Sequence, residues 1–168
     1  NVIVNEDFKF KTDKENGKRM LDHFEIEGEI GDGSFSKVKK IKDVNDGKEY
    51  ALKIYNKLFL QGQRTIDNDT GAWSNLLQRP KREIGIWIHL NHPNISKLYE
   101  IYEAVGNQYI YLRIELGTLG QVSEFDPKKR TITINPQLIK AYNIKGVDTR
   151  DKIIKDIFRQ MIAGVCYL

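Results

Sequence analysis

Apolar and polar residues alternate in three successive runs in the first third of the chain, and this pattern predicts three adjacent β-strands. The apolar positions of these runs are, in order, Phe24, Ile26 and Ile30, then Val38 and Ile41, then residues 50–54. Two glycines separate the first two runs, and Asn45-Asp46-Gly47 separates the second from the third. An Asp-Gly turn between such runs is a strong hairpin signal, because glycine supplies the positive φ that the turn needs. We therefore expect an antiparallel sheet.

A helix and two further strands are predicted beyond a polar connection. Residues 56–78 contain Gly, Asn and Asp clusters that are typical of a loop. A helix is expected from Pro80, which favours a first turn, to the Asn-His-Pro-Asn segment 91–94. Its apolar stripe carries one carboxylate and consists of Glu83, Ile84, Trp87, Ile88 and Leu90. Residues 95–101 and 109–116 supply two more strands.

The two ends of the chain differ from this central part. Residues 1–22 are polar and charged, and we expect them to lie over the sheet or to be partly mobile. Residues 117–120 are predicted to form a flexible joint, and residues 131–134 alternate as an edge strand would. Asp148 is predicted to cap a final helix. The apolar face of that helix is Ile153, Ile154, Ile157, Phe158, Met161, Ile162, Val165 and Cys166.

Composition excludes several classes of function. The chain has 168 residues and a net charge of +4, but its lysines are scattered, so a nucleic-acid-binding surface is not favoured. A single cysteine rules out an internal disulfide framework and fits an intracellular location, cytoplasmic and also nuclear. No apolar run is long enough for a membrane span. The spacing of His23, His89, His92 and Cys166 fits no metal-ligand pattern.

The glycine hairpin has the features of a phosphate cradle. Gly31 and Gly33 lack side chains, so backbone N–H groups at the bend can approach an anion. Lys53, on the third strand, supplies a positive charge for that anion. A dinucleotide-binding loop uses a similar glycine pattern but needs a helix directly after it, whereas residues 36–42 alternate as a strand does. That alternative therefore fails.

Gly31-x-Gly33-x-x-Ser36-x-Val38, followed by Ala51-Leu52-Lys53, resembles the nucleotide-binding lobe of eukaryotic serine/threonine protein kinases. Ser36 stands where that family has its third glycine. The resemblance covers residues 24–168 and implies an α+β, kinase-like N-lobe (a five-stranded antiparallel sheet plus one helix), a hinge and the first helical part of the C-lobe. The rest of the C-lobe is absent from the chain. The implied division is a leader (1–23), the N-lobe (24–116, insert 56–78), the hinge with an extended insert (117–147), and the first long C-lobe helix (148–168).

The resemblance also assigns site residues. Lys53 would contact the α- and β-phosphates of ATP, and Glu83 would hold Lys53 in position. Taken by itself, Glu83 would be interpreted as a surface carboxylate paired with a nearby lysine, and the glycine hairpin, Ala51-x-Lys53 and His92-Pro93-Asn94-Ile95 favour the pair with Lys53. Strand alternation should turn Arg113, beside the gatekeeper Ile114, to the opposite face of the sheet. The complete ATP-binding set is Ile30, Gly31, Asp32, Gly33, Ser34, Phe35, Ser36, Lys37, Val38, Ala51, Lys53, Ile114, Glu115 and Gly117.

The chain ends just before the segment that carries the catalytic aspartate and the Mg²⁺ ligands in this family, so we expect those groups beyond Leu168. The expected partners are a protein substrate, the rest of the C-lobe, and calmodulin or another regulator. The Arg79-Pro80 pair that ends a polar insert before Glu83, together with Glu115-Leu116-x-x-x-Gly120-x-Val122, resembles the calcium/calmodulin-dependent protein kinase kinases. The sequence of the insert and the longer segment 123–147 depart from those kinases. A pseudokinase that binds nucleotide without catalysis, or a β-rich interaction module, are the alternatives. The apolar face of the last helix should be uncovered and favour aggregation.

Overall fold

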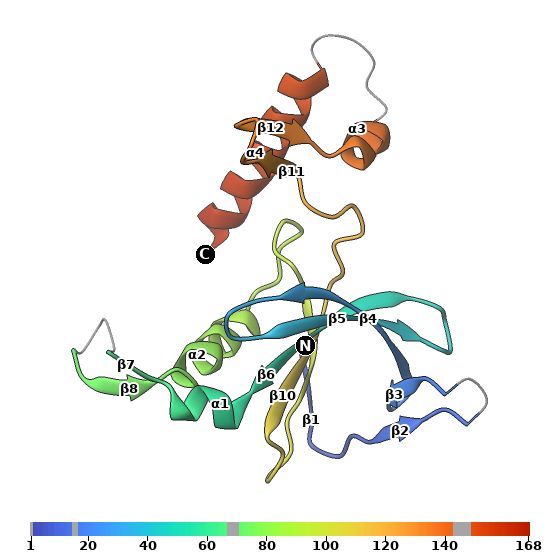
Figure 1. The fold of residues 1–168 in the computed structure, drawn as a ribbon, viewed down its shortest axis with the longest axis vertical. Helices are drawn as coiled ribbons and strands as arrows, with labels where there is room; N and C mark the ends of the chain where they lie inside the picture. Colours follow the sequence, from blue (N-terminus) through green and yellow to red (C-terminus); the bar gives the residue numbers. More distant parts are fainter. Residues whose placement is uncertain (1, 15–16, 67–70, 143–148) are drawn as a thin grey trace. The chain divides into compact units, whose positions relative to one another are not determined.

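The computed structural model describes residues 2–14, 17–66, 71–142 and 149–168, and the predicted cap Asp148 lies outside these ranges. The chain folds as two compact units. The first consists of residues 1–91 and 96–116, and the second of residues 92–95 and 117–168. Figure 1 labels most of the elements of both. The first unit contains the sheet, and all the predicted site residues except Gly117 belong to it.

The first unit is built on a sheet in which eight strands of the described chain are ordered β1-β9-β10-β6-β5-β4-β3-β2. The five strands expected from the sequence are all present, and the last of them ends at Ile114 rather than Leu116. Their bounds are β4 Phe24–Asp32, β5 Lys37–Asp43, β6 Glu49–Asn56, β9 Leu98–Tyr102 and β10 Tyr109–Ile114. They pair antiparallel throughout. The predicted antiparallel arrangement of these five strands is therefore confirmed.

Residues near the N-terminus extend this sheet at both edges. β1 (Ile3–Asn5) pairs parallel with β9, while β2 (Phe10–Thr12) and β3 (Arg19–Leu21) continue the sheet beyond β4. The expectation that residues 1–22 lie over the sheet was wrong for these strands. Edge strands present unpaired N–H and C=O groups, and these short segments satisfy them.

The turns differ in the way they use glycine. Gly47 has φ of +74°, as the Asp-Gly turn between β5 and β6 requires. Gly31 and Gly33 are not among the glycines of positive φ. The hairpin of β4 and β5 closes instead through residues 33–36, where the Gly33 N–H donates to the Ser36 carbonyl at 2.9 Å. The hairpin was predicted correctly, but positive φ is not the reason for these two glycines.

The connection 56–78 was predicted as a loop, and this was wrong. It contains the helix α1 (Lys57–Gly62) and a hairpin of β7 (Arg64–Ile66) and β8 (Trp73–Asn75). The Asn56 side chain caps α1 by accepting a hydrogen bond from the Phe59 N–H at 3.1 Å. Leu60 is completely buried and fixes the helix against the core. One buried residue in a short helix gives no periodic signal in the sequence.

The two faces of the sheet carry separate hydrophobic clusters, because successive side chains of a strand point to opposite faces. One cluster contains Tyr55, Leu60, Leu77, Leu98, Ile101, Ile110 and Leu112. The other contains Leu21, Phe24, Ile41, Leu52, Tyr102 and Tyr111. Helix α2 (Gln78–Trp87) packs on the first cluster through Ile84 and Trp87, two residues of its predicted apolar stripe. α2 starts two positions before Pro80 and ends at Trp87.

The second unit contains a hairpin and two helices. β11 (Ser123–Asp126) pairs with β12 (Thr131–Ile134), which confirms the predicted strand at 131–134. α3 (Pro136–Tyr142) and α4 (Thr149–Tyr167) complete this unit around Ile134, Leu138 and Ile153. The rest of the α4 apolar face is largely exposed, including Phe158 and Met161, each 59% exposed.

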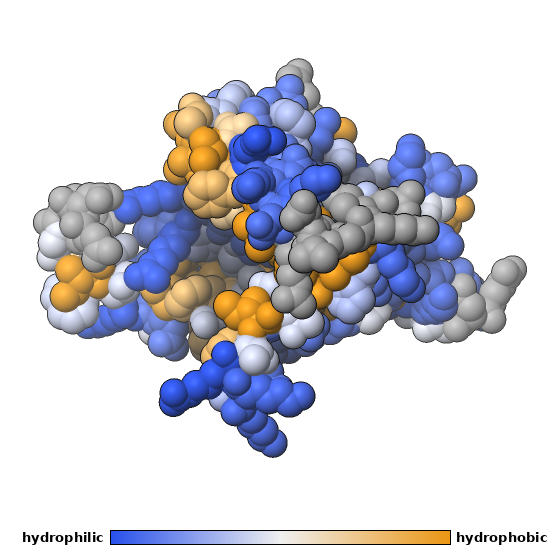
Figure 2. All heavy atoms as spheres, turned by 90° about the horizontal axis from the view of Figure 1, so that it is seen from above, coloured by the Kyte–Doolittle hydropathy of each residue, from blue (hydrophilic) through white to orange (hydrophobic). Residues whose placement is uncertain are grey.

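Apolar side chains form surface patches between polar ones on the face seen in Figure 2. No helix in the described ranges has the length and apolar character that a membrane crossing requires.

Candidate active site

The register of the sheet places three predicted site residues and Leu112 side by side on four adjacent strands. Gly31 of β4 lies opposite Val38 of β5, Val38 opposite Lys53 of β6, and Lys53 opposite Leu112 of β10. Directly opposed residues of antiparallel strands share a face, so the Val38, Lys53 and Leu112 side chains point to the same side. That side is the one on which α2 packs. The hairpin sequence thus places the glycines, the valine and the lysine together.

The Lys53 ammonium and the Glu83 carboxylate meet on this face, with Nζ 2.7 Å from Oε1. The Lys53 side chain is 21% exposed and that of Glu83 44%. The rings of Tyr55 and Trp87 also lie within cation–π distance of the ammonium, at 5.1 and 5.7 Å. The carboxylate on the apolar stripe of α2 is therefore partnered by the lysine expected for it.

Tyr55 is a member of the site that the sequence interpretation missed. Its hydroxyl donates to Glu83 Oε2 at 2.8 Å, so both carboxylate oxygens are bound. Burial, and then the hydrogen bond to Glu83, raises the pKa of Tyr55 well above its ordinary value, which keeps the hydroxyl protonated as a donor. The available signal was position, because residues 53 and 55 of one strand share a face.

Three members of the predicted ATP-binding set, Val38, Ala51 and Ile114, lie on the Lys53 side of the sheet. Ala51 is buried, and its strand partner across β6 and β10 is the gatekeeper Ile114, which is half-buried. Val38 is half-buried and Ile30 is 51% exposed. Glu115 is tied to Lys97, because its backbone N–H donates to the Lys97 carbonyl and its carboxylate accepts from the Lys97 N–H. Gly117 belongs to the second unit.

The glycine loop lies at the end of the β4–β5 hairpin. Lys37, which begins β5, pairs with Asp32 at 3.6 Å and with Glu29 at 3.4 Å, and these carboxylates raise the pKa of Lys37. Phe35 is 42% exposed, and its ring centroid lies 5.8 Å from Arg79 Cζ of α2. The remaining predicted members, Ser34 and Ser36, lie in the loop itself.

Packing within the loop does not explain why glycine stands at positions 31 and 33. A Cβ added at Gly31 would lie 3.5 Å from the Val38 Cβ, and one at Gly33 would lie 3.4 Å from the Ser36 carbonyl oxygen. Neither contact is prohibitive within the chain, and neither glycine has positive φ. The missing side chains keep the backbone accessible from outside, which suits an anionic ligand.

Arg113 lies on the other face of the sheet, as alternation predicted. Its guanidinium pairs with the buried Glu100 at 3.0 Å and lies 4.7 Å from the centroid of the Tyr50 ring. Tyr102 also donates a hydrogen bond to Glu100 at 2.8 Å, and Asn5 donates one at 3.2 Å. This group joins β1, β9 and β10 and leaves the Lys53 face unobstructed.

No group of three or more His, Cys, Asp or Glu residues suited to a metal ion occurs in the described ranges. His23 lies 3.4 Å from Asp43, and the His92 ring stacks near Tyr167. Cys166 is exposed rather than packed in an apolar environment.

Comparison with known proteins agrees with this geometry. The family model described as "Protein kinase domain" matches residues 24–168. CBL-interacting protein kinase 24 of Oryza sativa subsp. japonica is 32% identical over 143 residues, which cover 80% of this chain and 29% of the relative. A probable serine/threonine-protein kinase of Dictyostelium discoideum is 31% identical over 152 residues, or 90% and 18% of the two chains. Serine/threonine-protein kinase PLK4 of Drosophila persimilis is 24% identical over 148 residues, or 88% and 15%. The chain thus spans less than a third of the length of these relatives.

Proposed function

The chain belongs to the protein kinase family, and from that premise we propose that residues 24–116 bind ATP and that the protein containing them transfers its γ-phosphoryl group to serine or threonine of protein substrates. The relatives named above are serine/threonine kinases, which supports this class of substrate. The observation that carries the proposal is the contact of Lys53 with Glu83 beside the glycine hairpin.

Each site residue has a distinct role in this proposal. The Lys53 ammonium neutralises negative charge on the α- and β-phosphates, and its partial burial strengthens that attraction. Glu83 fixes the position of the ammonium, and Tyr55 fixes the second oxygen of Glu83. Tyr55 is thus a positioning residue. The open backbone of the glycine loop offers donors to the phosphates, while Val38 and Ala51 line the slot for the base.

Magnesium, when bound, would neutralise further phosphate charge and orient the phosphates. No metal-ligating cluster is present in the described ranges, so no step of the proposal depends on a metal ligand from them. We expect the Mg²⁺ ligands and the catalytic aspartate in the longer protein, after Leu168.

Within the serine/threonine kinases we propose a likeness to the calcium/calmodulin-dependent protein kinase kinases, with calmodulin or another regulator as partner and an intracellular location. Arg79 and Pro80, at the end of a polar insert, support this likeness, as does the segment Glu115-Leu116-x-x-x-Gly120-x-Val122, whereas the sequence of the insert departs from those kinases. The structure adds one observation, because Arg79 lies near the Phe35 ring of the glycine loop and within 3.4 Å of Thr65 in the insert. The insert therefore contacts the helix that carries Glu83.

Lys53→Ala in the full-length protein tests the phosphoryl transfer. We expect transfer from radiolabelled ATP to a generic protein substrate to fall at least roughly a hundredfold, because the developing charge loses its cation. Lys42→Ala is the matched control, since Lys42 is an exposed lysine of β5. Circular dichroism should show both variants folded, and unchanged turnover in Lys53→Ala would defeat the assignment.

A thermal shift with Mg²⁺-ATP separates the alternatives. Nucleotide at about 100 times its Kd should stabilise the protein by about 2.7 kcal/mol. Stabilisation without transfer in the full-length protein would favour the pseudokinase. No stabilisation at all would favour the interaction module.

A further inference from the structure

The sheet face opposite Lys53 holds a cavity of about 410 Å³. Leu52 and Ile54, which precede and follow Lys53 in β6, both line it. Alternation along a strand turns these two side chains away from Lys53, so the cavity lies on the other face of the sheet, although its wall includes residues 32–37 of the glycine loop. Its volume lies within the range of roughly 300–1,000 Å³ that is typical of small-molecule sites.

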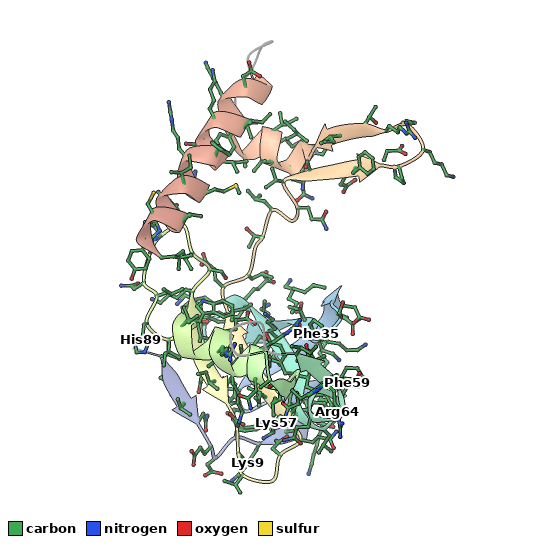
Figure 3. The ribbon with its side chains drawn as sticks, turned by 90° about the vertical axis from the view of Figure 1, so that its left-hand side faces the viewer. Lys9, Phe35, Lys57, Phe59, Arg64 and His89 are labelled. Atoms are coloured by element: carbon green, nitrogen blue, oxygen red, sulfur yellow. The ribbon has the colours of Figure 1, made fainter. Side chains whose placement is uncertain are left out.

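Half of the residues that line the cavity are aromatic or aliphatic. Phe10 of β2, Tyr109 and Tyr111 of β10, and Ile26 of β4 join Leu52 and Ile54 there. Phe35 of the glycine loop and Phe59 of α1 lie at the rim, exposed by 42% and 51%. Figure 3 shows these two phenylalanines on the same side of the first unit. A flat apolar ligand could therefore pack against the faces and edges of several aromatic rings.

Three cationic side chains also line the cavity, namely Arg19, Lys37 and Lys39. Lys37 is already paired with Asp32 and Glu29. Across the described ranges, neither Arg19 nor Lys39 has an ion-pair partner, although the Arg19 guanidinium lies 5.0 Å from the centroid of the Phe10 ring. Lys39 is half-buried, which makes its unpaired charge more costly than a fully solvated one.

The polar groups of the wall also favour an anion. Asp32 is the one carboxylate among the lining residues, and Lys37 neutralises it. The hydroxyls of Tyr109 and Tyr111 have no hydrogen-bond acceptor among the residues that the structure describes. Two uncommitted cations and two donor hydroxyls therefore surround an apolar space.

We propose that this cavity is a second ligand site, which binds a small amphipathic anion with an aromatic body and one acidic group such as a carboxylate or sulfonate. Lys39 and Arg19 would pair with the acidic group, and the apolar wall would receive the ring system. This proposal rests on the cavity alone and does not depend on nucleotide binding at Lys53.

A fluorescence titration of the folded chain with 8-anilinonaphthalene-1-sulfonate tests the site. Lys39→Gln should weaken saturable binding about five- to tenfold, because one charge-assisted contact is lost. Lys42→Gln removes the same charge from an exposed position of the same strand and should leave the affinity unchanged. The uncharged probe N-phenyl-1-naphthylamine should bind wild type and Lys39→Gln alike.

A second measurement distinguishes binding of the probe in the cavity from binding to the exposed apolar face of α4. In ¹H–¹⁵N spectra, the sulfonate probe should shift the amides of residues 33–37, 52 and 54 in the wild type, and the same shifts in Lys39→Gln should need about five- to tenfold more probe. Shifts confined to α4 would overturn the proposal. So would equal losses of affinity in the Lys39 and Lys42 variants, or a loss in Lys53→Gln as large as in Lys39→Gln.

Discussion

Tyr55→Phe should lower the free energy of unfolding of the first unit by about 1 kcal/mol. The substitution removes one hydroxyl, which donates to Glu83 Oε2 at 2.8 Å, and leaves the ring packed in the core. A hydrogen bond to a charged group contributes about 1.5–3 kcal/mol. Because the Glu83 side chain is 44% exposed, water can replace part of that bond, which brings the expected loss to the lower value.

Urea unfolding followed by tryptophan fluorescence measures this loss. The chain has two tryptophans, Trp73 and Trp87, and both belong to the first unit, so the signal reports on the unit that contains the site. Tyr109→Phe is the matched control. The Tyr109 hydroxyl has no acceptor in the described ranges, and we expect its removal to cost less than about 0.5 kcal/mol.

A double-mutant cycle shows whether the hydrogen bond is the source of the loss. With Glu83→Ala in place, the Tyr55 hydroxyl has lost its acceptor, so Tyr55→Phe should then be neutral or stabilising. An equal cost of Tyr55→Phe in both backgrounds would refute the reasoning. A cost no larger than that of Tyr109→Phe would refute it as well.

Other substitutions and conditions test other parts of the first unit by the same urea assay. Arg113→Met should cost about 3 kcal/mol, because it leaves the carboxylate of a nearly buried ion pair without its cation, and a loss below 1 kcal/mol would contradict this. Gly85→Ala should raise the free energy of unfolding by about 0.5–1 kcal/mol, because Gly85 lies in the interior of α2 with open space around it. Gly47→Ala should lower the free energy of unfolding by about 1 kcal/mol, because Gly47 has φ of +74°. Changes of the opposite sign would contradict these two predictions. Burial raises the pKa values of Tyr55 and Tyr102 above their unfolded value near 10, so stability should be complete below about pH 10 and fall as the pH rises above it. Tyr102→Phe should reduce that slope, and an unchanged slope would exclude this linkage.

The central strands and the Lys53–Glu83 contact could be predicted because their signals are local. Alternating residues, one Asp-Gly turn and a helical stripe each lie within about ten residues. Glu83 was identifiable as a partner because a carboxylate on an apolar stripe needs a cation. The opposite orientation of Arg113 followed from alternation alone. In each of these cases, local geometry determines which face a side chain occupies.

The edge strands and the helix of the insert could not be predicted, because their partners are distant in sequence. Ile3 pairs with Glu100, and nothing in residues 1–5 identifies that edge. α1 is held by a single buried leucine and one N-cap, and a sequence with only these two features looks like that of a loop. Tyr55 was missed for a different reason: a tyrosine in a strand is usually a core residue, and its role depends on the distance from its hydroxyl to the helix.

The two candidate sites share strand β6 and residues 32–37 of the glycine loop, and this affects how variants of that strand are to be interpreted. Lys53 faces α2, while Leu52 and Ile54 on either side of it face the cavity. The backbone of these residues is hydrogen-bonded to both β5 and β10, so it cannot shift toward one face without moving the side chains of the other. A substitution at Ile54 that weakens nucleotide binding would therefore not place that residue in the nucleotide site. A substitution can be assigned to the cavity only if it alters binding of the anionic probe while the Lys53–Glu83 ion pair remains intact.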